Sequence, residues 1–153
     1  MTDVTRSSVE EKIIVRVVTV DRTRTPEAAL TATGRRQYVT KEVVAAMPNS
    51  KDKTKKVTFF HVGRTISDEE LEKEFTKHNL TPVDPFTLAA INEADPTFAD
   101  KYPNGTQWKD VIGKVCKAVF SGWGGEQRVD VNSSSGDWHD AWLYAGEEKA
   151  PQT

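Results

Sequence analysis

The sequence has few of the features that mark secreted, membrane-bound or nucleic-acid-binding proteins. It has a single cysteine, Cys116, which excludes a disulfide within the chain and favours a reducing compartment. No run approaches the roughly 18 apolar residues of a membrane span, and the polar N-terminal stretch lacks the apolar core of a signal peptide. The formal net charge of only −2 gives no strong field that would attract nucleic acid or an anionic membrane. We therefore expect a cytoplasmic protein with no membrane span and no nucleic-acid partner.

The sequence also lacks a recognisable catalytic motif. The glycine-rich stretch Gly122–Gly125 (G-W-G-G) is not followed by Lys and Ser or Thr, as it would be in a phosphate loop. Cys116 lies in the alternating stretch V-C-K-A-V-F, which predicts a buried structural thiol in a strand and not a nucleophile. We therefore predict a protein that is not an enzyme and that has no cofactor.

Acidic residues and a histidine near the C-terminus leave two metal-dependent alternatives open. Asp137, His139 and Asp140 are residue types that ligate metals, and a small metal-dependent hydrolase that uses them is one alternative function. A weak calcium site is the other, because hard cations accept loops of oxygen ligands. Its candidate ligands are Asp130, Asn132, Asp137 and Asp140.

The length and the patterning of the chain indicate a single α+β domain. With 153 residues, of which 37% are hydrophobic and 29% charged, the chain has the size and composition of one globular domain. We place this domain at residues 12–147, between disordered tails at 1–11 and 148–153. Short helices fill mainly the first two thirds, and an antiparallel meander of three strands forms the end.

Local patterns predict where the individual elements lie. Strands are expected at 12–21 (mostly buried), 56–62, 114–120, 127–132 and 141–145. Helices are expected to begin at the capping residues Thr25, Thr40, Ser67 and Asp84. Residues 97–110 are expected to be irregular, with a turn at Pro103-Asn104-Gly105.

The segment from Val129 to Gly146 (VDVNSSSGDWHDAWLYAG) differs in composition from its surroundings. It contains no Lys, Glu, Gln or Met, and it combines Trp and Tyr with Asp, Asn, Ser, His and Gly. Binding loops favour this combination, because rigid aromatic rings supply contact area while short polar groups supply adaptable hydrogen bonds. We predict a non-catalytic binding protein with a protein or glycan ligand. The predicted recognition residues are Asp130, Asn132, Ser133, Ser134, Ser135, Gly136, Trp138, His139, Asp140, Ala141, Leu143 and Tyr144.

Several motifs resemble those of a group of small uncharacterised bacterial proteins. The motifs are D-P-F-T-L-A-A-I-N-E-A-D-P-T-F-A-D, P-N-G-T-Q-W-K-D, W-G-G-E-Q-R-V-D-V and the ending D-W-H-D-A-W-L-Y-A-G. They extend over roughly the last two thirds of the chain. The motifs are distinctive, but this resemblance implies no particular chemistry.

The ending also resembles the variable proteins of diversity-generating retroelements, which carry a C-terminal hypervariable segment on a C-type-lectin-like fold. Such elements mutate adenines in template codons of the type AAY, and the amino acids that they reach exclude Lys, Glu, Gln, Met and Trp. The resemblance implies a hypervariable recognition surface between the fixed residues Trp138, Trp142, Ala145 and Gly146. The implied variable residues are Asp130, Asn132, Ser133, Ser134, Ser135, Gly136, His139, Asp140, Ala141 and Leu143. An alternative binding function is that of a phage or plasmid accessory protein that inhibits a host factor by surface contact.

Overall fold

A mixed sheet of eight strands is the main feature of the structure, a computed structural model that describes residues 13–149 apart from the side chain of Trp123. The helices are α2 (Pro26–Thr31), α3 (Lys41–Ala45), α4 (Asp68–Lys77), α5 (Pro85–Ala94) and α6 (Phe98–Lys101), with a short 3-10 helix η1 at Trp123–Gly125. The strands are β1 (Ile13–Thr19), β2 (Arg36–Val39), β3 (Thr54–His61), β4 (Leu80–Pro82), β5 (Asn104–Lys109), β6 (Val115–Ser121), β7 (Arg128–Ser133) and β8 (Leu143–Glu148). A single domain that contains both helices and strands is therefore confirmed, and it is richer in strands than the predicted α+β arrangement.

The last strand, β8, lies near the middle of the sheet and not at its edge. The strand order is β1-β3-β8-β5-β6-β7-β2, with β4 pairing separately with β8. Neighbouring strands are antiparallel except for the parallel pairs β2–β7 and β5–β8. The predicted terminal meander is therefore correct for β6 and β7 but wrong for β8, which pairs with β3, β4 and β5. Sequence order favours neighbouring strands as partners, but the apolar character of β8 on both faces selects the buried centre of the sheet.

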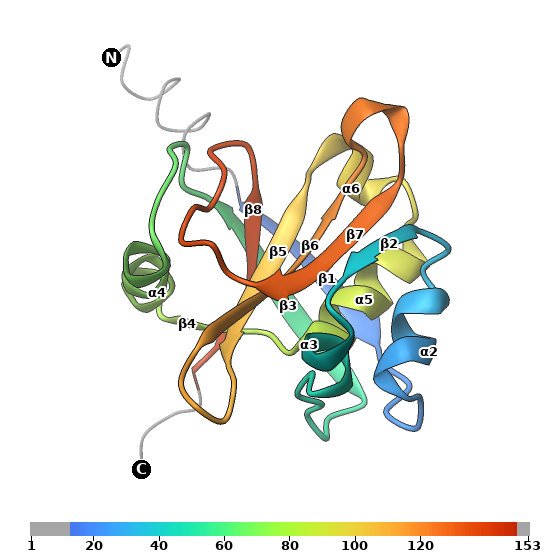
Figure 1. The fold of residues 1–153 in the computed structure, drawn as a ribbon. Helices are drawn as coiled ribbons and strands as arrows, with labels where there is room; N and C mark the ends of the chain where they lie inside the picture. Colours follow the sequence, from blue (N-terminus) through green and yellow to red (C-terminus); the bar gives the residue numbers. More distant parts are fainter. Residues whose placement is uncertain (1–12, 150–153) are drawn as a thin grey trace.

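Each face of the sheet carries its own hydrophobic core. The consecutive residues Phe59 and Phe60 are both fully buried, but they belong to different cores, because successive side chains of a strand point to opposite faces. The larger core packs the sheet against α2, α3, α5 and α6, and we call this side the helix face. The smaller core packs the opposite side against α4 and Trp138. Figure 1 shows α4 well apart from the cluster of α2, α3 and α5.

Strand β1 forms where the sequence predicts a strand, but the prediction that it is mostly buried is wrong. Among residues 13–149 it lies at the edge of the sheet and pairs only with β3. Ile13, Val15 and Val17 are 54%, 46% and 69% exposed, whereas Val18 on the helix face is buried. A run of β-branched residues indicates a strand, but whether the second face is covered depends on elements far away in the chain.

The stretch 97–110 is not irregular, and the predicted turn at Pro103-Asn104-Gly105 is wrong. Helix α6 and strand β5 occupy most of it, and Asn104 begins the strand. The Asn104 amide is fully buried and pairs reciprocally with Asn92 of α5, with N···O distances of 2.8 and 3.2 Å. This buried amide pair supplies the hydrogen bonds that an asparagine in a turn would make locally. Strands β2 and β4 were also not predicted.

The helix starts predicted from capping residues are confirmed. The Thr25 hydroxyl accepts a hydrogen bond from the Ala28 amide, Ser67 forms a capping box with Glu70, and Asp84 accepts from the Thr87 amide. Thr40 also precedes its helix, α3, but its side chain makes no capping bond. Its hydroxyl contacts the Asn132 side-chain oxygen of β7 at 2.8 Å instead.

Most residues of the two predicted disordered tails lie outside the described part of the chain, but the start of the C-terminal tail lies within it. Residues 1–11 of the predicted N-terminal tail and residues 150–153 of the C-terminal one lie outside the described residues. Strand β8 extends to Glu148, which pairs with Leu80, so the first residue of the predicted C-terminal tail belongs to the sheet. Among residues 13–149, no helix is long and apolar enough to cross a membrane.

Replacing Asn104 with alanine is expected to destabilise the protein by about 2–4 kcal/mol, because it leaves the buried side-chain oxygen of Asn92 without its donor. Urea unfolding followed by tryptophan fluorescence measures this change. The matched control is Asn132→Ala, which removes a half-buried amide bonded to the exposed Thr40 and is expected to cost less than about 1 kcal/mol. Equal losses for the two variants would contradict the structural role of the Asn92–Asn104 pair.

Candidate functional site

The loop 134–142 connects β7 to β8 and is held in place by a buried tryptophan. Trp138 is fully buried in the smaller core, and its indole nitrogen donates a hydrogen bond of 2.7 Å to Asp68 at the start of α4. Its backbone exchanges two hydrogen bonds with Ile66, of 2.8 and 3.1 Å. The Ser134 hydroxyl donates to the same Asp68 oxygen at 2.5 Å. Both the beginning and the middle of the loop are therefore anchored to α4 and the strand-like segment before it.

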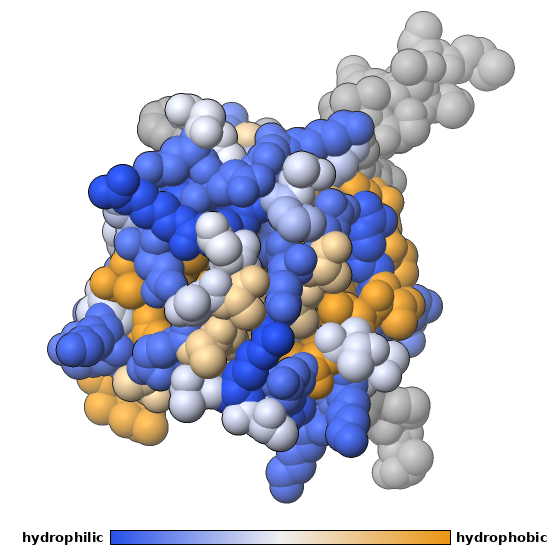
Figure 2. Space-filling view, turned by 90° about the vertical axis from the view of Figure 1, so that its right-hand side faces the viewer, coloured by the Kyte–Doolittle hydropathy of each residue, from blue (hydrophilic) through white to orange (hydrophobic). Residues whose placement is uncertain are grey.

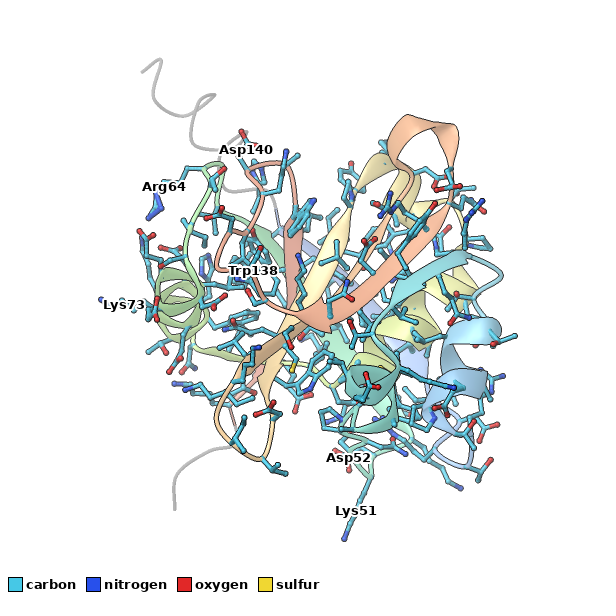
Figure 3. The ribbon with its side chains drawn as sticks, viewed as in Figure 1. Lys51, Asp52, Arg64, Lys73, Trp138 and Asp140 are labelled. Atoms are coloured by element: carbon cyan, nitrogen blue, oxygen red, sulfur yellow. The ribbon has the colours of Figure 1, made fainter. Side chains whose placement is uncertain are left out.

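The outer part of the loop carries the exposed polar side chains. His139 and Asp140 are 61% and 58% exposed, and Figure 3 shows Asp140 at the outer end of the loop, away from Trp138. The backbone beneath them is fixed, because the Tyr144 hydroxyl donates to the His139 carbonyl at 3.0 Å and the His61 ring nitrogen lies 2.9 Å from the Asp140 carbonyl. Burial raises the pKa of the Tyr144 phenol far above its ordinary value, so this hydroxyl stays protonated and remains a donor.

A cluster of charged and aromatic side chains lies beside the loop on β7 and β2, opposite the helix face. Arg128 makes a bidentate salt bridge to Asp130, with N···O distances of 2.9 and 2.8 Å. Its guanidinium also lies 3.9 Å from the centroid of the Tyr38 ring. The Tyr38 hydroxyl donates to Glu126 at 2.6 Å, and this hydrogen bond raises the pKa of Tyr38. The hydrogen bond to Asp130 likewise raises the pKa of Arg128, so the guanidinium stays charged.

A chain of contacts joins this cluster to the loop. The Asn132 amide donates to the Tyr38 carbonyl at 3.3 Å, and Asn132 is the cross-strand neighbour of Lys117 on β6. The Lys117 ammonium lies 5.6 Å from the Trp142 ring centroid, and the His139 ring stacks on Trp142 at 5.7 Å. We call the surface formed by these residues the polar face. Its members are Tyr38, Lys117, Arg128, Asp130, Asn132, His139 and Trp142.

Most of the predicted recognition residues reach the surface. Ser135, His139, Asp140 and Ala141 are exposed. The half-buried ones are Asp130, Asn132, Ser133, Ser134 and Gly136. Together they occupy the end of β7 and the loop that follows it, so the structure brings them into one neighbourhood.

Three of the predicted recognition residues do not lie on the surface. Trp138 and Tyr144 are fully buried and Leu143 is 2% exposed, so the expectation that they form part of an exposed surface is wrong. Trp138 and Tyr144 pack edge to face at 5.9 Å in the smaller core, and Leu143 belongs to the core of the helix face. The sequence does not distinguish an aromatic ring that binds a partner from one that anchors a loop, because both occur among short polar residues.

Three members of the polar face were missed by the sequence reasoning. Tyr38 joins the site because β2 pairs in parallel with β7, and a parallel pair between distant segments leaves no local signal. Arg128 and Lys117 lie in strands that were predicted, but their neighbours across the sheet were not known. The alternation Arg128, Asp130, Asn132 along β7 was the available signal, since Val129 and Val131 between them are fully buried.

The residues considered for metal binding are placed differently from a ligand set. Within residues 13–149, no three His, Cys, Asp or Glu side chains gather closely enough to hold a metal ion. His139 and Asp140 contact each other at 2.9 Å. Asp130 is engaged with both of its oxygens by Arg128.

Cys116 is a buried thiol on the helix face, as the sequence predicts. It is 2% exposed, and burial raises its pKa above the usual value. A raised pKa lowers the fraction of thiolate, the reactive form. Cys116 therefore has the environment of a structural residue.

No protein-family model, no curated protein and no solved structure matches the chain.

Replacing Trp138 with phenylalanine is expected to destabilise the protein by about 2–4 kcal/mol, because it removes the bond to Asp68 and leaves a cavity. Trp142→Phe is the matched control. Trp142 is only half-buried and is held by ring contacts, so we expect a loss of about 1 kcal/mol or less. Thermal unfolding followed by circular dichroism measures both. If Trp142→Phe were the more damaging substitution, Trp138 would not be the anchor of the loop.

The native Cys116 thiol is expected to react with iodoacetamide at least about tenfold more slowly at pH 8 than the thiol of the urea-unfolded chain. Both causes, burial and the raised pKa, disappear on unfolding. Mass spectrometry of samples quenched over time gives the two rates. Equal rates would show that Cys116 is accessible in the folded protein.

Proposed function

We propose that the protein is a non-catalytic binding protein that contacts a partner through the polar face and the outer part of loop 134–142. One observation carries the proposal: short polar side chains from Asp130 to Ala141 lie at the surface of a loop and strand whose anchors are buried. A surface of this kind can make or change contacts while the fold beneath it stays the same. No reacting group is required for this function.

The contacts within the polar face favour a protein as the partner. Tyr and Arg are enriched among the residues that contribute most to protein–protein binding, and here Tyr38 and Arg128 stack on each other. The salt bridge to Asp130 holds Arg128 in place, which lowers the entropy lost when a partner binds. The aromatic ring nearest the loop, Trp142, is engaged by His139 and Lys117 and so offers less ring surface to a sugar.

The variability expected for a retroelement variable protein fits the surface from Asn132 to Ala141. Trp138 and Ala145, which the resemblance treats as fixed, are fully buried. Gly146 is also constrained, because a Cβ atom there would lie 2.8 Å from the Cβ atom of Leu80. The proposed variable positions end at Ala141, since Leu143 is buried. The proposal rests on this surface and not on a C-type-lectin-like fold, and it places the protein in the cytoplasm, where a single free cysteine stays reduced.

Sequencing of the gene and its surroundings tests the retroelement part of the proposal. We expect a reverse-transcriptase gene nearby and an imperfect repeat of the 3′ coding end, with mismatches only at template adenines. Variation among closely related copies should fall at Asn132, Ser133, Ser134, Ser135, Gly136, His139, Asp140 and Ala141. Absence of the repeat would remove this part and leave an invariant binding surface, as in an accessory protein that inhibits one host factor.

A display library tests whether the surface can change without unfolding the protein. Randomising Asn132, Ser135, His139, Asp140 and Ala141 is expected to cost less than about 1 kcal/mol per position and to give variants that bind hen egg-white lysozyme, used as an arbitrary protein probe. Protease resistance of the displayed variants reports folding. A control library randomised at the buried residues Trp138, Leu143 and Tyr144 should lose folded members. Equal loss of folding in both libraries would contradict the proposed separation of surface and scaffold.

A further inference from the structure

The edge strand β1 exposes an apolar face that the rest of the described chain, residues 20–149, leaves uncovered. Ile13, Val15 and Val17 alternate along the strand, point away from the helix face and are between 46% and 69% exposed. An exposed apolar strand at a sheet edge is unusual in a protein that acts alone, because its free backbone groups are a template for pairing with another strand.

The free backbone groups of β1 belong to the same residues that expose their side chains. Just beyond the paired residues Thr19 and Thr54, the Val20 amide donates to the Lys53 carbonyl at 2.6 Å. In an antiparallel ladder every second residue makes such bonds, so Val18, Arg16 and Ile14 direct their amide and carbonyl groups toward β3. The groups of Ile13, Val15 and Val17 therefore face outward from the sheet.

We infer that β1 pairs with β1 of a second copy of this chain, antiparallel and centred on Val15. This register places Val15 opposite Val15 and Ile13 opposite Val17, so the three exposed apolar side chains of each strand meet those of the other. A two-fold symmetric contact requires a patch that is complementary to itself, and the equal spacing of Ile13 and Val17 on either side of Val15 satisfies this requirement.

Charge selects this register over its nearest alternative. Arg16 points to the helix face, where its guanidinium lies 4.8 Å from the Phe98 ring centroid. Pairing centred on Arg16 would place two arginines directly opposite each other, which is unfavourable. Pairing centred on Val15 places Arg16 opposite Ile14 and brings no two like charges face to face.

The expected dimer is weak and depends on concentration. A seven-residue strand with three apolar side chains buries much less than the roughly 1,600 Å² of a standard protein interface. We therefore expect the weight-average mass measured by light scattering to rise from 17.1 kDa toward twice that value as the concentration increases from micromolar to millimolar. A single mass of 17.1 kDa over the whole range would overturn the inference.

A charge at the centre of the contact is expected to abolish the dimer. Val15→Lys places two lysines opposite each other at the two-fold axis, while the exposed position leaves the fold intact. The matched control is Val111→Lys, at a fully exposed apolar residue of the β5–β6 hairpin, and this variant should associate like the natural protein. If both variants lowered association equally, a contact at β1 would be excluded.

Cysteine crosslinking tests the register itself. Directly opposite residues of an antiparallel pair have Cα atoms about 5.5 Å apart, within disulfide reach, so Val15→Cys should form a crosslinked dimer under mild oxidation. Ile13→Cys alone should not, because its two copies lie about four residues apart along the strand, roughly 13 Å. Mixing Ile13→Cys with Val17→Cys should restore the crosslink.

Val111→Cys measures the rate of crosslinking by random collision. The native Cys116 is buried and stays out of the reaction. We expect Val15→Cys to crosslink about tenfold faster than Val111→Cys, because pairing raises the effective concentration of the two thiols. The register would be contradicted if Val15→Cys and Val111→Cys crosslinked at equal rates. It would also be contradicted if a mixture of Val15→Cys and Val17→Cys crosslinked faster than Val15→Cys alone. Equal rates are also the outcome expected if the chain's own N-terminal residues or a different protein occupied the edge.

Discussion

The central place of β8 in the sheet is the constraint on which the rest of the structure depends. Four consecutive residues, Leu143 to Gly146, are buried, with Leu143 and Ala145 in the core of the helix face and Tyr144 in the smaller core. The strand pairs with β3 on one side and β5 on the other. Both cores therefore remain incomplete until the C-terminal segment has entered the sheet, and contacts over such long sequence separations slow folding.

The course of the chain from β7 to β8 explains why a binding surface forms where it does. Strands β6 and β5 lie between β7 and β8 in the sheet, so the connecting loop has to cross both of them. Helices α2, α3, α5 and α6 occupy one face, and the loop crosses the other, where Trp138 fills the space beside α4. Figure 2 views the molecule from the side on which α2 and β2 lie, and this side is largely hydrophilic with apolar patches between the polar residues. The polar face therefore follows from the strand order, because strands β2, β6 and β7 and the crossing loop form it without an additional helix or strand.

The sequence predicts the fold well where the determining contacts are local. Helices α2, α4 and α5 are marked by Thr25, Ser67 and Asp84, whose side chains cap amides only a few residues away. Strands β2 and β5 could not be predicted in this way. The partner of β2 is the distant strand β7, and Asn104 at the start of β5 is satisfied by Asn92 of a helix, although its immediate neighbours are typical of a turn.

The sequence predicts which segment of the chain forms the site, but not which residues of that segment are exposed. Alternation along β7 separates Val129 and Val131 from Asp130 and Asn132, and the structure buries the former pair and half-exposes the latter. Loop 134–142 has no such alternation of buried and exposed residues, because the course of its backbone determines which side chains are exposed. The sequence therefore predicts Trp138 as a contact residue, whereas in the structure it is buried and holds the loop through Asp68.

The burial of Leu143 and Tyr144 limits any mechanism that varies this surface. Both are amino acids that a template with AAY codons can reach, so their amino-acid type does not protect them. Each lies in one of the two cores, where replacing a large apolar or aromatic side chain with a small one costs about 2–5 kcal/mol. This approaches the whole stability of an ordinary domain, so most changes there would be lost with the fold. Diversification is therefore compatible with this structure only where the template protects β8 and varies the residues before Trp142, apart from the anchor Trp138.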